Sequence, residues 1–98
     1  MLLTERETQE GLLVSVCDPD VLGQTFEDGP VSLTVEESFY AEGAEEADED
    51  RVVGALARAS VANIVGTRAV SLAVENGFVD ESTVLNLDGT RHAQLLRM

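Results

Sequence analysis

The chain has 98 residues, of which 19 are Asp or Glu and 6 are Lys or Arg, and its formal net charge is −13. A chain of this length buries roughly 60–65% of the surface that its unfolded form exposes, so we expect a single domain over residues 1–98 with one modest core. The composition, 44% apolar and 26% charged, excludes a disordered chain, and the charge argues against DNA binding because the phosphate backbone would repel the protein.

Three strands and one short helix are predicted in the first half of the chain. Residues 1–5 and 11–17 are predicted as strands, and apolar side chains on both faces of 11–17 indicate that both faces are at least partly buried. Asp18 is placed to cap a short helix with Pro19 at its first position. The alternation over 31–35 predicts a half-buried strand. The short helix would carry three apolar residues and end before Asp28-Gly29-Pro30; they are Val21, Leu22 and Phe26.

The second half begins with a pattern typical of two helices. After an acidic stretch at 41–50, apolar positions recur at helical spacing over about 48–65, and Gly66 suits a C-terminal cap. Thr67 is placed to cap a second helix over 68–76, which Asn76-Gly77 would end. The predicted stripe of the first helix consists of Val52, Val53, Leu56, Ala57, Ala59, Ser60, Ala62 and Ile64, and that of the second of Val70, Ala73 and Val74.

The C-terminal region gives the clearest local signal, a β-hairpin. Asp88-Gly89 suits a two-residue type I′ turn between strands at 84–87 and 90–96. This turn places 87 opposite 90, 86 opposite 91, 85 opposite 92 and 84 opposite 93. One face then holds Leu85, Leu87, Thr90, His92, Gln94 and Leu96. We therefore expect an α+β, two-layer domain whose mostly antiparallel sheet has a C-terminal β-hairpin packed against a helix pair.

The charge is unevenly distributed along the chain. Residues 1–50 carry 15 acidic residues and one arginine, whereas residues 51–98 carry four acidic residues and five arginines. Lysine is absent, and strong acidity with arginine as the only base is typical of proteins from salt-accumulating halophilic archaea. The alternative is an ordinary acidic protein at ordinary salt. If acid serves solubility, the near-neutral second half is a candidate interface; the alternative is that this half is simply more buried.

Catalytic and metal-binding signatures are missing from the sequence. One His and one Cys cannot supply the ligands of a structural zinc site, so we expect no metal and no cofactor. A pair of Cys17 and His92 is conceivable as a nucleophile and its base, but no third orienting group can be assigned. We therefore predict no catalytic residues. The single Cys17, the absence of a signal peptide and the absence of an apolar stretch of about 20 residues indicate a cytoplasmic protein without a membrane partner.

Five residues are candidates for binding: Tyr40, Asn63, Arg68, Arg91 and His92. His92 is either a satisfied core histidine or a contact for a ligand or RNA. The junction from Asn63 to Arg68 either satisfies its own turn or holds an anion such as phosphate on free backbone N–H groups at the start of the second helix. Phe39-Tyr40 either packs in the core or exposes one ring for stacking.

Several short segments in order resemble a known family of small archaeal proteins, domain of unknown function 424. They are Cys17-Asp18, Leu22-Gly23-Gln24-Thr25-Phe26, Phe39-Tyr40 before an acidic loop, Ala62-Asn63-Ile64-Val65-Gly66, and Gly89-Thr90-Arg91-His92-Ala93-Gln94. The sequence departs from the family where Ala41-Glu42 stands in place of glycines. The resemblance implies a two-layer α+β fold and an archaeal origin, brings no known activity, and implies at most a link to translation.

Three hypotheses of function follow. The first is a non-enzymatic interaction domain with a protein or ribonucleoprotein partner, accessory to translation or RNA handling. The second is a purely protein-binding or self-assembling module, since a terminal hairpin can leave an edge strand that pairs with a second copy in a homodimer. The third is a small enzyme centred on His92.

Overall fold

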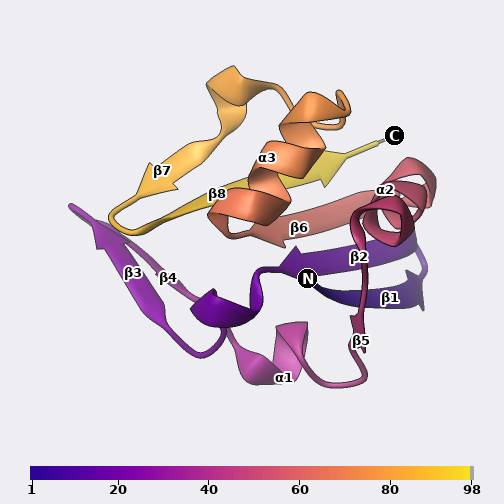
Figure 1. Cartoon of the computed structure of the whole chain (residues 1–98), viewed down its shortest axis with the longest axis horizontal. Coiled ribbons are helices and arrows are strands. Elements are labelled where there is room, and N and C mark those ends of the chain that lie inside the picture. Colours follow the sequence, from indigo (N-terminus) through magenta and orange to yellow (C-terminus); the bar gives the residue numbers. More distant parts are fainter. Residues whose placement is uncertain (98) are drawn as a thin grey trace.

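The computed structural model describes residues 1–97 and is organised by a six-stranded sheet (Figure 1). Its strands lie in the order β5-β1-β2-β6-β8-β7, and all neighbours are antiparallel except β2 and β6. This arrangement confirms the predicted α+β class and the mostly antiparallel sheet. The strands are β1 (Leu2–Thr8), β2 (Gly11–Cys17), β5 (Glu45–Glu46), β6 (Val61–Val65), β7 (Leu85–Leu87) and β8 (Thr90–Leu96).

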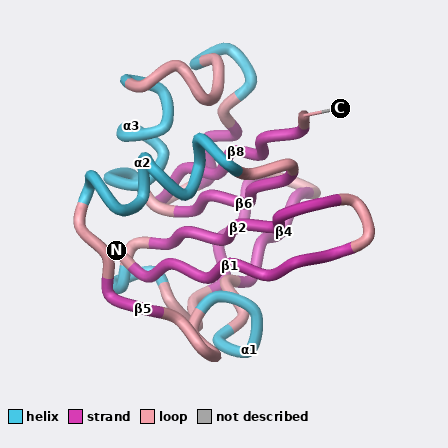
Figure 2. The backbone as a smooth tube through the Cα atoms, turned by 90° about the vertical axis from the view of Figure 1, so that its right-hand side faces the viewer, coloured by secondary structure: helices cyan, strands magenta, loops and turns pink. Residues whose placement is uncertain are grey.

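Two helices, α2 (Glu49–Arg58) and α3 (Thr67–Glu75), cover one face of this sheet (Figures 1 and 2). The main hydrophobic core lies between them and the strands, and Ala93 and Leu95 of β8 belong to it. The predicted packing of the C-terminal hairpin against a helix pair is therefore confirmed. The largest fully buried side chains of this core are Leu3, Val14, Val16, Val52, Leu56, Ile64 and Val70.

A small layer covers part of the opposite face, and of its elements the sequence predicted the strand at 31–35 and the start of the helix at Pro19. It consists of the 3₁₀ helix η1 (Pro19–Val21), the two-stranded sheet of β3 (Thr25–Asp28) and β4 (Val31–Thr34), and the short helix α1 (Glu37–Tyr40). Figure 1 shows β3 and β4 below the β7–β8 hairpin and α1 below β1 and β2. They enclose a second apolar cluster of Cys17, Val21, Phe26, Val35, Tyr40, Val65 and Leu87.

The prediction of one helix over 48–65 is wrong after residue 58. Asp48 caps α2, accepting a hydrogen bond from the Arg51 N–H at 2.8 Å, but the backbone becomes extended at Ala59 and residues 61–65 form the central strand β6. Ala62 and Ile64 satisfy both patterns, because they fit the helical stripe and are also two residues apart, the period of a strand. Gly66 consequently precedes α3 as its N-cap and does not terminate a helix.

The helix predicted after Asp18 is also wrong beyond its first turn. Only Pro19–Val21 are helical, and Phe26 lies in β3. Gly23 has a φ of +79°, outside the helical region, which ends the turn and redirects the chain into the small sheet.

The hairpin register is confirmed at 85 opposite 92, 86 opposite 91 and 87 opposite 90. The pairing does not continue to Val84, whose N–H donates to the Glu81 carbonyl at the end of the 3₁₀ helix η2 (Glu81–Thr83). Val84 is buried in the main core, so the chain leaves the plane of the sheet there. None of the helices within residues 1–97 has the length and apolar character that a membrane crossing requires.

Candidate functional site

The sheet face opposite α2 and α3 is built from rows of side chains that cross the strands. Residues that are directly paired between neighbouring strands point to the same side of a sheet, so the observed register defines each row. The first row contains Leu2, Cys17, Val65, His92 and Leu85. The second contains Thr4, Ser15, Asn63 and Gln94. The third contains Arg6, Leu13, Val61 and Leu96.

The small layer buries only part of this face. Thr4, Ser15, Cys17, Val65, Leu87 and Thr90 are buried on this face. The remaining side chains of β6, β8 and β7 on this face are accessible, namely Val61, Asn63, Leu85, His92, Gln94 and Leu96. Leu96 is 72% exposed and Leu85 is 39% exposed. The accessible region, which we call the open patch, consists of Leu13, Val61, Asn63, Leu85, His92, Gln94 and Leu96.

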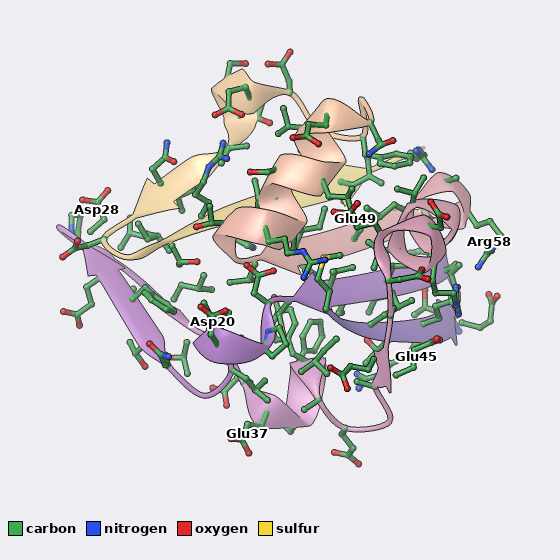
Figure 3. The ribbon with its side chains drawn as sticks, viewed as in Figure 1. Asp20, Asp28, Glu37, Glu45, Glu49 and Arg58 are labelled. Carbon is green, nitrogen blue, oxygen red and sulfur yellow. The ribbon has the colours of Figure 1, made fainter. Side chains whose placement is uncertain are left out.

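The open patch carries no acidic side chain. Strands β2, β6, β7 and β8 contain no Asp or Glu at all. The two acidic residues of β1, Glu5 and Glu7, point to the opposite face, where Glu5 forms ion pairs with Arg51 and Arg58 of α2. The acidic side chains labelled in Figure 3 lie on the small layer (η1, β3 and α1), on β5 and on α2, and none lies on β2, β6, β7 or β8. A chain with a net charge of −13 thus presents one sheet surface, on β2, β6, β7 and β8, whose strands carry no carboxylate, and the charged side chain at its β1 end is Arg6.

Three polar side chains occupy the middle of the open patch. The Gln94 side-chain amide donates to the Asn63 carbonyl oxygen Oδ1 at 3.0 Å, across the β6–β8 pairing. Burial lowers the pKa of His92 below its ordinary value of 6.5, so the imidazole is neutral at pH 7. A neutral imidazole and two amides supply both donors and acceptors, which suits hydrogen bonding to a neutral polar partner.

An open hollow of about 410 Å³ lies along the outer side of β8, next to the open patch. It begins where β7 stops pairing and is walled on one side by Thr83 of η2. All of its lining residues are uncharged, including the neutral His92: Thr83, Leu85, His92, Ala93, Gln94 and Leu96.

The other three sequence candidates lie elsewhere. Arg91 points to the helix-covered face, where it contacts the Ser71 hydroxyl at 3.3 Å and pairs with Glu81. Arg68 starts α3 beside a separate hollow that it lines with Asp48, Glu49 and Asp50. Tyr40 is buried against Phe39, with ring centroids 4.9 Å apart, and burial raises its pKa to about 12. The structure therefore brings Asn63 and His92 together and separates them from the rest.

The expected anion-binding position at the start of α3 is filled by the chain's own Asp18. Its carboxylate accepts from the N–H of Arg68 at 2.9 Å and from the N–H of Ala69 at 3.0 Å. Gly66, at φ +114°, permits this approach, because a Cβ there would lie 2.4 Å from the carboxylate. These donors are consequently not free for phosphate. Burial raises the pKa of Asp18 by more than the two N–H donors lower it.

The conceivable pair of Cys17 and His92 does not form. Both lie in the first row, but Val65 of β6 stands between them, and two strand spacings amount to about 10 Å. Burial raises the pKa of the Cys17 thiol to about 11, which disfavours the reactive thiolate. Among residues 1–97, no group of three or more His, Cys, Asp or Glu side chains is arranged to hold a metal ion.

The sequence placed part of the open patch correctly. The hairpin register alone puts Leu85, His92, Gln94 and Leu96 on one face, and that grouping is confirmed. Asn63 could not be placed beside Gln94, because residues 61–65 were assigned to a helix. Leu13 and Val61 were missed for the same reason, since only the β2–β6–β8 pairing brings them to this face.

The fold and its open patch define a class of small α+β domain with one sheet face covered by helices and the other partly open. The chain belongs to the protein family of unknown function DUF424, whose model matches residues 5–98. Among solved structures, an uncharacterised conserved protein from Methanopyrus kandleri is similar, with a TM-score of 0.73 and 26% sequence identity. The match covers 99% of this chain and 93% of that one. No curated protein matches the sequence.

Proposed function

We propose that this protein is a non-enzymatic interaction domain that docks a partner on the open patch. The observation that carries the proposal is an accessible sheet surface without carboxylates in a chain that has 19 of them. A carboxylate on a docking surface would have to lose its water on binding, and that desolvation is costly unless the charge is paired. An uncharged surface with exposed leucines avoids this cost.

The partner that suits this surface is a protein or a ribonucleoprotein. Leu85 and Leu96 offer apolar contact, and Asn63, His92 and Gln94 offer hydrogen bonds to backbone amides or to base edges. The narrower version of the proposal, a cytoplasmic accessory role in translation or RNA handling, rests on the family resemblance. The accompanying proposal of salt adaptation rests on the acidity and the absence of lysine.

Capture from native lysate at high salt, with matched variants, tests this function. Gln94→Glu introduces a carboxylate into the open patch, and Gln9→Glu makes the same change at an exposed position in the β1–β2 turn. We expect wild type and Gln9→Glu to retain the same partner and Gln94→Glu to lose it, with all three equally folded by circular dichroism. Equal capture by both variants would show that the open patch is not the docking surface. Captured material without ribosomal proteins or RNA would reject the translation version.

A further inference from the structure

The outer edge of β8 is open along part of its length. β8 runs from Thr90 to Leu96, but β7 pairs only with residues 90–92, and the structure of residues 1–97 places no strand beside residues 93–96 on that side. The N–H of Gly66 donates to the Arg91 carbonyl, and the N–H of Arg97 donates to the Ser60 carbonyl. These bonds show that the odd-numbered residues of β8 point their backbone N–H and C=O groups toward β6. The alternate residues, Gln94 and Leu96, therefore point their N–H and C=O groups outward.

This edge lacks the features that usually protect an exposed strand. Proteins blunt such edges with charged side chains, proline or bulges, and residues 93–96 are Ala, Gln, Leu and Leu. The opposite edge of the sheet differs. There β1 extends beyond the short strand β5 as Thr4-Glu5-Arg6-Glu7, a charged segment of the kind that discourages pairing. The two edges are therefore treated differently by the sequence, since residues 93–96 of β8 are uncharged whereas residues 5–7 of β1 are charged.

We propose that a second copy of this chain pairs with β8 at this edge, so that two sheets join about a two-fold axis at Leu95. The two β8 strands run antiparallel with Gln94 of each copy opposite Leu96 of the other. Because both residues direct backbone groups outward, each of these two pairs exchanges two hydrogen bonds. The pairing is confined to this short stretch, since Leu85 of β7 already occupies the position opposite His92.

The side chains at this edge complement each other across the two-fold axis. Leu96 is 72% exposed and projects from the open-patch face of β8. Leu85 of β7 lies opposite His92, two residues before Gln94 in β8. In the proposed register, Leu96 of the second copy lies opposite Gln94, on the same face as Leu85 and about 7 Å further along the strand direction. That position is the hollow of about 410 Å³ lined by Leu85, His92 and Gln94. Each copy thus contributes the same leucine and the same hollow, as a two-fold interface requires.

The charge distribution favours a second copy as the occupant. Two chains of net charge −13 repel each other, so they can meet closely only over a surface free of carboxylates, and the edge at residues 93–96 is such a surface. The repulsion weakens as salt screens it, so association should strengthen in molar KCl. Edge-to-edge pairing about this axis also leaves both open patches on the same side. The inference does not depend on the proposed docking function, and the dimer would leave Leu13, Val61 and Asn63 of each open patch outside the paired edge.

Light scattering over a range of protein concentrations, in low salt and in molar KCl, tests the dimer. We expect wild type to dimerise with a dissociation constant that falls as the KCl concentration rises. Leu96→Glu should raise that dissociation constant at least tenfold. Val31→Glu is the matched control, because Val31 is 41% exposed on β4, away from this edge. A wild type that stays monomeric at every concentration in both salts overturns the proposal, and so does a dimer that Leu96→Glu leaves unchanged.

Cysteine pairing tests the register independently. Gln94→Cys and Leu96→Cys chains, mixed and oxidised, should form a mixed disulfide, because opposite residues of a hydrogen-bonded pair have Cα atoms about 5.5 Å apart. Each variant alone should cross-link much less, since like residues would be about 8 Å apart, beyond disulfide reach. Equal cross-linking in all three samples would reject this register. Native Cys17 does not interfere, because its side chain is fully buried.

Discussion

Replacement of Asp18 is the sharpest test of how the end of β2, Gly66 and the start of α3 are joined. In Asp18→Ala, the N–H groups of Arg68 and Ala69 lose a carboxylate that accepts from them at 2.9 Å and 3.0 Å. Hydrogen bonds to a charged group contribute about 1.5–3 kcal/mol each, and the loss of a helix cap costs about 0.5–2 kcal/mol. Because burial of the carboxylate offsets part of the first figure, we expect a net loss of about 2 kcal/mol.

Urea unfolding followed by circular dichroism, at one fixed KCl concentration, measures this loss. For a domain of this size about 2 kcal/mol corresponds to a decrease of about 8–16 °C in Tm. Asp20→Ala is the matched control, because Asp20 is an exposed neighbour whose carboxylate makes no hydrogen bond within residues 1–97. A difference between the two variants below about 0.5 kcal/mol would refute the assignment of Asp18 as the cap of α3.

The pH dependence of the same protein provides an independent check. Burial raises the folded-state pKa of Asp18 above the ordinary value of 3.8, so the folded state takes up its proton before the unfolded state does. Wild type should therefore gain stability relative to Asp18→Asn as the pH falls toward 3.8, and lose that gain as the pH rises through the folded-state pKa. The comparison with Asn cancels the titration of the other acidic residues. An advantage of wild type over Asp18→Asn in the free energy of unfolding that grows as the pH rises would contradict this account.

Two further predictions concern the glycine beside Asp18 and the histidine of the open patch. Gly66→Ala should lower the free energy of unfolding by about 3 kcal/mol, because its Cβ would lie 2.4 Å from Asp18 at a φ of +114°. Gly54→Ala in α2, whose Cβ would have no contact closer than 3.7 Å, should raise that free energy by about 0.5–1 kcal/mol. The midpoints of urea unfolding test both predictions. Burial lowers the pKa of His92 below 6.5, so wild type should lose stability as the pH falls from 6.5 through the folded-state pKa. A His92→Gln variant whose stability depends on pH as steeply as that of wild type would disprove this prediction.

Elements defined by local chemistry were predictable from the sequence. The Asp88-Gly89 turn fixes the hairpin register by itself, because a two-residue turn leaves one way to pair the flanking strands. Asp48 at the start of α2 and the apolar stripe of α3 are equally local signals. These elements were right because nothing distant in the chain is needed to specify them.

The errors arose where a distant partner decides the structure. Residues 61–65 become a strand because β2 and β8 pair on either side of them, and that environment overrides a helical spacing of apolar residues. Asp18 was assigned to the helix that follows it, but its carboxylate caps a helix 50 residues later in the chain. Since β6 and Asp18 together determine where Asn63 and Arg68 lie, both errors propagated directly into the candidate site.

The near-neutral second half of the sequence has a different explanation from the one its charge suggested. Its five arginines do not form a basic surface. Arg51 and Arg58 pair with Glu5, and Arg91 pairs with Glu81. Arg97 donates to backbone carbonyls at the end of α2, and Arg68 lines a hollow with Asp48, Glu49 and Asp50. The half is poor in acid mainly because it supplies the strands β6 and β8 and the helix α3, each of which contributes buried residues to the core. What the sequence leaves free of carboxylates at the surface is the open patch and one strand edge, and the first half contributes Leu13 to that patch and Arg6 beside it. Charge counted along the chain therefore coincides with the open patch only at the residues that β6 and β8 contribute. Charge counted over a folded face is the quantity that bears on the proposed function.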